Sequence, residues 1–294
     1  MGWQDRDYHR HDPGVPHAFA PRFGRRSIVF WLLAINIGVL VLDGIIGRMV
    51  GMPHDEGPLF RIGYFSASQA IQKLQVWRFF TFQFLHAGMP HLFGNMLGIF
   101  FFGPMIEQYL GSARFLRFYL ICGFAGAIGY LVLWGTGLVV SAPGIPLVGA
   151  SAGVFGILIA AAMVAPNAKV LLFFVLPIPI RVLAWLIVGV AAYTVLAKGH
   201  VAGSNAGGDA AHLGGALLGF LLIRSPALLN WQPRLFSAAP RGPGRWQRRQ
   251  QESRRDTAEV DRILTKVKEH GLHSLSRREK KILQKATEKQ RRAG

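Results

Sequence analysis

The sequence predicts an all-α, polytopic membrane protein with six transmembrane helices and a small helical hairpin at the C-terminal end. Hydrophobic residues make up 51% of the 294 residues and charged residues only 16%, whereas a soluble domain carries about 25% charged residues. Charge is almost missing from long stretches between Ser27 and Ser225 and is concentrated at both ends. A bilayer imposes this segregation, because a charged side chain at its centre costs roughly 2.5–3.5 kcal/mol.

Six apolar runs are long enough to be membrane-spanning helices. They cover residues 27–47, 90–107, 115–134, 149–165, 180–197 and 209–224. A further apolar run, 169–180, is broken by Pro177 and Pro179. It is too short to span the membrane alone, and we interpret it as an interfacial lead into the fifth helix.

The composition divides the chain into four segments. We expect a cytoplasmic N-terminal segment over 1–26, a membrane core over 27–225, a basic linker rich in Pro, Gly and Arg over 226–255, and a cytoplasmic helical hairpin over 256–294.

Apolar residues at helical spacing predict the hairpin. The first helix carries them at i, i+3, i+4 and i+7: Val260, Ile263, Leu264 and Val267. Gly271 is placed to end this helix. Ser276 and Glu279 then form a capping-box pattern that opens the second helix.

The net charge of +18 lies mostly behind the last span. Residues 231–294 contain 18 Lys and Arg against 7 Asp and Glu, so this tail contributes 18 − 7 = +11. A basic tail of this kind predicts a cytoplasmic segment in contact with anionic lipid headgroups rather than specific nucleic-acid binding. The Lys and Arg residues between the spans also predict that both termini are cytoplasmic, with the long loop 48–89 as the exception. With no organellar presequence evident, we expect a bacterial inner membrane.

Three of the spans carry polar residues near their non-cytoplasmic ends. The second has His91 and Asn95, the fourth has Ser151, and the sixth has His212. Polar groups within a bilayer are unfavourable and usually face a bundle interior or a wet cavity. The topology therefore brings a candidate nucleophile, a candidate base and two hydrogen-bonding side chains to a similar depth.

Each candidate alone has a structural alternative. Ser151 lies among small residues (149–153), which suit either a reactive hydroxyl at a helix N-terminus or helix packing. His212 shares a helix face with Gly215, one turn before Gly219, so a closely packed helix would approach its imidazole. His212 could act as a general base, or it could be a structural histidine or a metal or proton-relay ligand.

The remaining polar candidates lie around the second span. His91 and Asn95 are four residues apart on one helix face, where two donors could stabilise an oxyanion. His86 is predicted to support this site or to lie at the interface. The single cysteine, Cys122, lies in an apolar run and is predicted to pack in the core.

Taken together in order and spacing, these motifs resemble the rhomboid family of intramembrane serine proteases. They are His86 with His91-Leu92-Phe93-Gly94-Asn95, Gly149-Ala150-Ser151, and Ala211-His212-xx-Gly215-xxx-Gly219, with Trp77-Arg78 and Glu107–Ser112 as accessory features. The resemblance covers roughly 27–225. It implies a Ser151–His212 dyad without a catalytic Asp, an oxyanion site formed by His91, Asn95 and the Ser151 N–H, and transmembrane proteins as substrates.

Two positions depart from the family pattern. Ala152 stands where the family often has Gly, and Phe155 stands where some members have Tyr; stacking on His212 survives the second change but a hydroxyl bond does not. We expect no cofactor and no metal, because no acidic or thiol ligand accompanies the histidines; Asp209 is the nearest and lies at the loop edge. The alternatives are a non-catalytic rhomboid-like protein that binds transmembrane clients, and a small transporter.

Overall fold

The computed structural model describes residues 27–52, 57–139, 142–172, 175–201, 203–230 and 245–291. The predicted segment 1–26 and residues 231–244 of the predicted linker lie outside these ranges. The chain forms two compact units, Met1–Ser237 and Ala238–Gly294, and each is described by itself.

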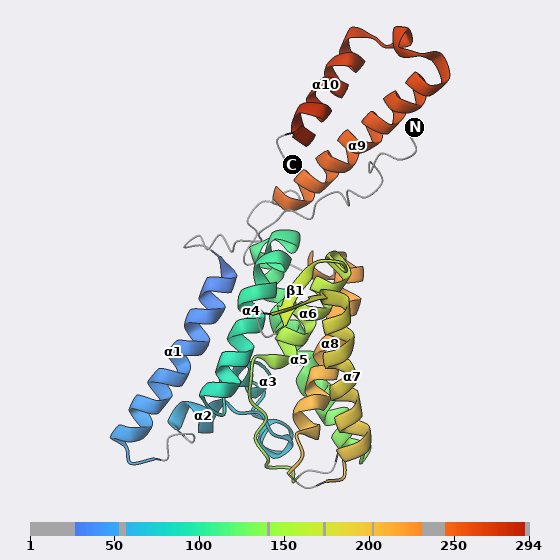
Figure 1. The fold of residues 1–294 in the computed structure, drawn as a ribbon. Coiled ribbons are helices and arrows are strands. Elements are labelled where there is room, and N and C mark those ends of the chain that lie inside the picture. Colours follow the sequence, from blue (N-terminus) through green and yellow to red (C-terminus); the bar gives the residue numbers. More distant parts are fainter. Residues whose placement is uncertain are drawn as a thin grey trace. The chain divides into compact units, whose positions relative to one another are not determined.

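The membrane unit is a bundle of long apolar helices (Figure 1). They are α1 (Ile28–Met49), α4 (Met89–Leu110), α5 (Ser112–Gly135), α6 (Ser151–Val164), α7 (Ile180–Lys198) and α8 (Ala206–Arg224). Five of them are long and apolar enough to cross a membrane, and α6 is a shorter apolar helix. The predicted all-α polytopic fold is therefore confirmed, and each predicted span corresponds to one of these helices.

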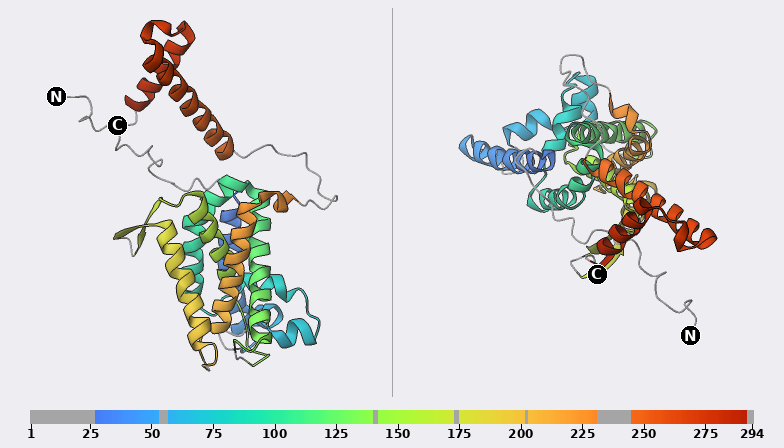
Figure 2. Two further views of the ribbon diagram at one scale, coloured as in Figure 1. Left: turned by 90° about the vertical axis from the view of Figure 1, so that its right-hand side faces the viewer. Right: turned by 90° about the horizontal axis from the view of Figure 1, so that it is seen from above.

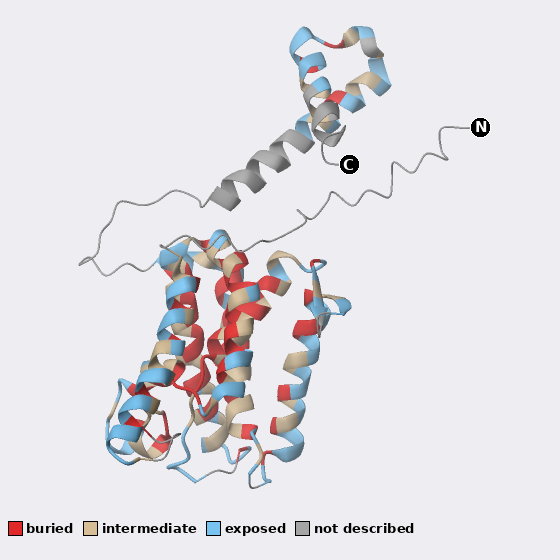
Figure 3. Cartoon of the chain, turned by 60° about the vertical axis from the view of Figure 1, so that its left-hand side comes forward, coloured by how far each residue is buried: buried red, intermediate tan, exposed pale blue. Residues whose placement is uncertain are grey.

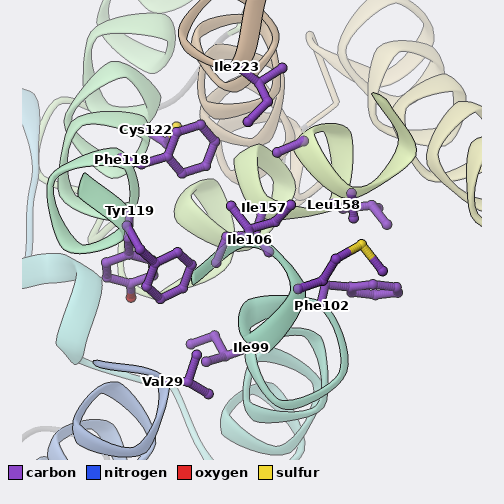
Figure 4. Packing of buried hydrophobic residues seen from close by; sticks show 14 of the residues in the cluster. Val29, Ile99, Phe102, Ile106, Phe118, Tyr119, Cys122, Ile157, Leu158 and Ile223 are labelled. Atoms are coloured by element: carbon purple, nitrogen blue, oxygen red, sulfur yellow. The ribbon is translucent and has the colours of Figure 1, made fainter. Parts of the chain in front are cut away.

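Helix α6 occupies the middle of the bundle. It contacts α4, α5, α7 and α8, and its Ile157 is fully buried. Figure 4 shows Ile157 among side chains from the neighbouring helices, including Phe118 and Cys122. Cys122 is fully buried, as expected for a core residue.

Helix α6 is shorter than the membrane is thick. At 14 residues, it is about 21 Å long, whereas the hydrocarbon core of a bilayer is about 30 Å thick. At least one end of α6 therefore lies below the membrane surface.

The outer helices present apolar side chains away from the bundle. Figure 2 shows α7 at the edge of the bundle in its left view and α1 at the edge in its right view. Figure 3 shows buried residues gathered between the helices. Trp31 on α1 and Trp185 on α7 are both exposed. Exposed apolar side chains on a helix bundle of this composition fit a lipid environment, in which the outer surface need not be polar.

Glu107 fastens α1 to α4. Its carboxylate accepts hydrogen bonds from the Ser27 hydroxyl (2.7 Å) and from the backbone N–H groups of Ile28 (2.9 Å) and Val29 (3.2 Å). The first N–H groups of a helix have no partner within the helix, so this acid caps α1 from a neighbouring span.

The predicted loop 48–89 contains short helices. They are α2 (Pro58–Gly63), η2 (Ser68–Gln72), α3 (Arg78–Thr81) and η3 (Phe82–Phe84). Arg78 is buried and donates from its guanidinium to the backbone carbonyls of Tyr64 (2.5 Å) and Arg61 (2.9 Å) and to the Gln75 side chain (2.6 Å). One side chain thus ties three turns of this segment together, which gives the Trp77-Arg78 motif a structural reason.

Residues 169–180 lead directly into α7, as predicted, and they do so as a pair of strands. The antiparallel strands are β1 (Lys169–Leu172) and β2 (Leu176–Pro179), and β2 ends one residue before α7 begins. Proline is tolerated in strands that lie at the edge of a sheet, and both strands of a two-stranded sheet are edges. Pro177 and Pro179, which break the apolar run in the sequence, are therefore compatible with β2.

The tail unit is a helical hairpin of α9 (Arg245–His270) and α10 (Arg277–Arg291). Helix α9 begins inside the segment predicted as linker (226–255), whose first residues also form the short helix η4 (Pro226–Asn230). Gly271 has a φ of 76°, a left-handed conformation that favours glycine after a helix.

The capping box of α10 is present as predicted. The Ser276 N–H donates to Glu279 (2.8 Å), and the Glu279 N–H donates to the Ser276 hydroxyl (3.2 Å). Lys266 on α9 also donates to both oxygens of Glu279 (3.1 and 3.2 Å), so this carboxylate joins the two helices. The bond from the Ser276 N–H and the bond from Lys266 lower the pKa of Glu279 from 4.5 to about 2.

This pKa predicts acid-sensitive packing of the tail. Folding lowers the pKa of Glu279, so its ionised carboxylate stabilises the folded hairpin. This stabilisation is fully present above the ordinary pKa of 4.5 and is lost as the pH falls from about 4.5 to about 2. We expect hydrogen exchange of residues 260–283 in the full chain, corrected for intrinsic rates, to rise over this window. Glu279→Gln, the matched control, should remove this part of the pH dependence. An unchanged profile in that variant would show that other acids control the tail.

Candidate functional site

Ser151 is the first residue of α6 and is held there by the first-loop segment. The Gly149 N–H donates to the carbonyl of Phe82 (2.9 Å), and Leu147 exchanges two backbone hydrogen bonds with Phe65 (2.7 and 3.0 Å). The short helices of residues 57–84 thus support the strand-like entry to α6. The hydroxyl stands at a helix N-terminus, where free N–H groups and the helix dipole favour negative charge.

His212 faces this hydroxyl from the first half of α8. Its Nε2 lies 2.7 Å from the Ser151 Oγ, which is within hydrogen-bonding distance. Phe155, one turn after Ser151 on α6, stacks on the imidazole with ring centroids 4.2 Å apart and planes inclined by 14°. Ser151, His212 and Phe155 are therefore brought together, and the stacking expected for Phe155 is present.

Glycines allow α6 and α8 to approach closely enough for this contact. A Cβ added to Gly215 would collide with the carbonyl oxygen of Ala152, and one added to Gly219 would lie 2.6 Å from the Gly156 Cα. Both glycines share the His212 face of α8, as the sequence pattern predicts. The close backbone packing is thus on the side of the helix that carries the imidazole.

Gly149 lies between Ser151 and His91. Its φ is 128°, which other residues rarely adopt. A Cβ added there would lie 2.7 Å from the His91 Cε1 and 3.5 Å from the Ser151 Oγ. His91 therefore lies near the serine, and a side chain at position 149 would collide with its ring.

Asn95 and His86 flank His91. Asn95 is buried, and one N–H of its amide donates to the His91 carbonyl one turn earlier (3.0 Å). The His86 ring lies edge-on to the His91 ring, with centroids 5.2 Å apart. Burial, with a smaller effect of His91, lowers the pKa of His86 to about 3, so this imidazole is neutral at physiological pH. His86 thus adjoins the site through His91 and does not touch Ser151.

Comparison with known protein families matches most of the membrane unit. Residues 73–225 match the family model described as the rhomboid domain. The chain belongs to the rhomboid family. The matched range of this rhomboid includes Ser151, His212, Phe155, His91, Asn95 and His86. Residues 247–289 match a second model, described as a family of unknown function (DUF6576), which covers the tail hairpin.

Individual relatives come from plants, bacteria and yeast. The rhomboid is 34% identical over 121 residues to RHOMBOID-like protein 1 of Arabidopsis thaliana, covering 38% of this chain and 29% of the relative. It is 34% identical over 94 residues to the putative rhomboid protease YdcA of Bacillus subtilis, covering 32% of this chain and 47% of the relative. It is 34% identical over 165 residues to Rhomboid protein 1, mitochondrial, of Saccharomyces cerevisiae, covering 55% of this chain and 45% of the relative. The chain thus spans less than half the length of these relatives.

Asp209 is the site residue that sequence reasoning set aside. The sequence places Asp209 at the edge of a loop, and in the structure it lies in the first turn of α8. Its Oδ1 lies 3.0 Å from the Nδ1 of His212. The i, i+3 spacing of these two residues places them on one helix face, and this signal was present in the sequence.

Within the residues that the structure covers, the side chains at this site do not form a set of metal ligands. No group of three or more His, Cys, Asp or Glu side chains that could hold a metal ion occurs among them. The arrangement that is present, a hydroxyl bonded to an imidazole at a helix N-terminus, suits nucleophilic chemistry with a general base.

Proposed function

We propose that this rhomboid is an intramembrane serine endopeptidase, with Ser151 as nucleophile and His212 as general base. The observation that carries the proposal is the 2.7 Å distance between the Ser151 Oγ and the His212 Nε2. It is supported by the stacking of Phe155, which restricts rotation of the imidazole, and by the family's known intramembrane proteases.

The proposed reaction proceeds through an acyl-enzyme. As the Ser151 Oγ bonds to the substrate carbonyl carbon, its proton passes to the His212 Nε2, and the carbonyl oxygen becomes an oxyanion. Collapse of this intermediate breaks the C–N bond, and the Nε2 proton goes to the leaving amine. Water then attacks the ester, gives a proton to Nε2, and releases the acid as the Ser151 hydroxyl is restored.

We assign the oxyanion to the space beside Gly149. The Ser151 N–H at the helix N-terminus, the His91 ring and the Asn95 amide are the proposed donors. Negative charge on the substrate oxygen would be favoured there by the α6 dipole as well. His86 is proposed to support the orientation of His91 through their ring contact.

The proposed substrates are proteins with a transmembrane segment. A peptide carbonyl inside an α-helix accepts an N–H bond from four residues ahead and is shielded by side chains, so a helical segment must unwind before Ser151 can attack it. We therefore expect preferred substrates to contain weak helix formers such as glycine near the cleaved bond.

The test of this function is cleavage of a defined substrate. The purified full chain in detergent is given a single-span protein with a fluorescent group on each side of the span. We expect two products, with the new termini located by mass spectrometry in or next to the span. Binding of the substrate without cleavage, and without reaction of Ser151 with a fluorophosphonate, would support the non-catalytic binder instead.

Replacing Asn95 tests the oxyanion assignment. We expect Asn95→Ala to lower kcat by on the order of 10-fold or more with KM little changed, because the bond strengthens only as the oxyanion forms. The measurement is steady-state cleavage kinetics on protein of equal folded fraction. A loss that appears only in KM would assign Asn95 to substrate binding or to holding the His91 backbone.

The orientation proposed for the membrane places both termini in the cytoplasm. On a chain with Cys122 replaced, Ile145→Cys, which lies before α6, should react with a membrane-impermeant maleimide added to intact bacterial cells. Lys280→Cys in α10 should react only after permeabilisation. The opposite pattern would invert the orientation and move the site to the cytoplasmic face.

We also propose that the basic hairpin contacts anionic lipid headgroups. This contact should weaken as the salt concentration rises.

A further inference from the structure

The polar environment of His212 includes one acid. Its Nδ1 lies 3.0 Å from the Asp209 Oδ1, and the two side chains are 15% and 14% exposed. On its other sides the ring meets Ser151 at Nε2 and Phe155 over its face, and His91 is a further titratable group near the site, since it adjoins Gly149 next to Ser151. Asp209 is thus the acidic partner at the nitrogen that faces away from the serine.

A carboxylate at this position decides where the imidazole proton lies. An ionised carboxylate can only accept hydrogen bonds, so a bond between Asp209 and Nδ1 requires the proton on Nδ1. The neutral ring then has its lone pair on Nε2, the nitrogen 2.7 Å from the Ser151 Oγ. This tautomer is the one that can accept the serine proton.

We propose that Asp209 is a positioning residue that holds His212 in the Nδ1–H tautomer and stabilises the imidazolium formed during the reaction. The inference rests on the proposed function and replaces the dyad implied by the family resemblance with a Ser151–His212–Asp209 relay of hydrogen bonds. Only the Ser151 proton moves to Nε2, while the Nδ1 proton stays on the ring and its bond to Asp209 becomes charge-assisted.

A purely structural role for Asp209 would have a different signature. An acid in the first turn of a helix is stabilised by the helix dipole, so the Asp209 carboxylate could simply favour folding of α8. In that case its loss would lower thermal stability, leave the His212 tautomer unchanged, and leave kcat per folded molecule unchanged.

The first measurement is the tautomer of His212 in the full chain. With ¹⁵N-histidine labelling in detergent, and His212→Gln to assign its signals, we expect the wild type at neutral pH to show the proton on Nδ1. In Asp209→Asn, whose amide can donate to the ring, we expect a gain of the Nε2–H tautomer. A wild-type signal showing the proton on Nε2 would overturn the proposal, even if the variant does not fold.

The second measurement is the kinetics of Asp209→Asn. We expect kcat, and the rate at which Ser151 reacts with a fluorophosphonate, to fall on the order of 10- to 100-fold, with KM within about 2-fold. Asp43→Asn is the matched control, since Asp43 is a buried acid that binds the N–H groups of Leu59 and Phe60 outside this site. An Asp209→Asn kcat within 2-fold of wild type would overturn the proposal.

These outcomes separate this inference from the proposed function. Wild-type protein that neither cleaves substrate nor reacts at Ser151 would defeat the protease assignment. Wild-type protein that does both, together with an unchanged kcat in Asp209→Asn, would defeat only the role of Asp209.

Discussion

Ser151→Ala and His212→Ala are each expected to abolish cleavage while leaving the protein folded. Ser151 supplies the attacking oxygen, and His212 supplies the only base within hydrogen-bonding distance of it among the described contacts. Residues that act as one unit have strongly non-additive effects, so the double variant should be no less active than either single variant. The measurement is substrate cleavage by each purified variant, compared at equal folded fraction.

The control for this pair is Thr194→Ala on α7. The Thr194 hydroxyl donates to the Val190 carbonyl of its own helix (3.0 Å), so its removal deletes a hydroxyl in the same unit outside the site. We expect wild-type cleavage from this control. Cleavage by Ser151→Ala at the wild-type rate would end the assignment of Ser151 as the nucleophile.

Gly215→Ala is expected to have the second largest effect on cleavage. It removes no reacting group but should increase the distance between Ser151 on α6 and His212 on α8. The added methyl group would collide with the Ala152 carbonyl oxygen, which is backbone and cannot rotate away, so α8 must move from α6. Overpacking of this kind typically costs 1–3 kcal/mol of stability. A displacement of about 1 Å at a reacting pair can lower the rate by on the order of 100-fold. We expect both a lower unfolding temperature and a kcat loss of that order.

The matched control is Gly189→Ala in the middle of α7, where an added Cβ meets nothing within 4 Å. It makes the same chemical change in a membrane helix without the collision. We expect its cleavage rate and unfolding temperature to stay close to wild type. If Gly215→Ala behaves like this control, the close approach of α6 and α8 does not set the Ser151–His212 distance.

The fold was predictable because the bilayer leaves a strong signal in the sequence. Long uncharged runs located all six helices, and the glycine spacing of Gly215 and Gly219 indicated which face of α8 packs closely. The β1–β2 pair was not predictable in the same way, since Pro177 and Pro179 end a helix and also fit edge strands. Nothing local to residues 169–180 distinguishes these outcomes.

The site was predictable where polar residues occur in apolar helices. Ser151, His91, Asn95 and His212 stood out for that reason, and the topology placed them at similar depth. Contacts made by the backbone were not predictable, such as the bond from the Gly149 N–H to the Phe82 carbonyl, because any residue can supply a carbonyl. Asp209 was missed although its spacing from His212 was visible, because its place near a loop suggested a solvated side chain.

The most direct test of the central assignment is the identity of the residue that reacts with a fluorophosphonate. The full chain in detergent is treated with the reagent, digested, and mapped by mass spectrometry. We expect a single covalent adduct on the Ser151 Oγ, with labelling lost in His212→Ala and retained in Gly189→Ala. Labelling at another serine, or equal labelling of Ser151 in the presence and absence of His212, would contradict a nucleophile activated by this histidine.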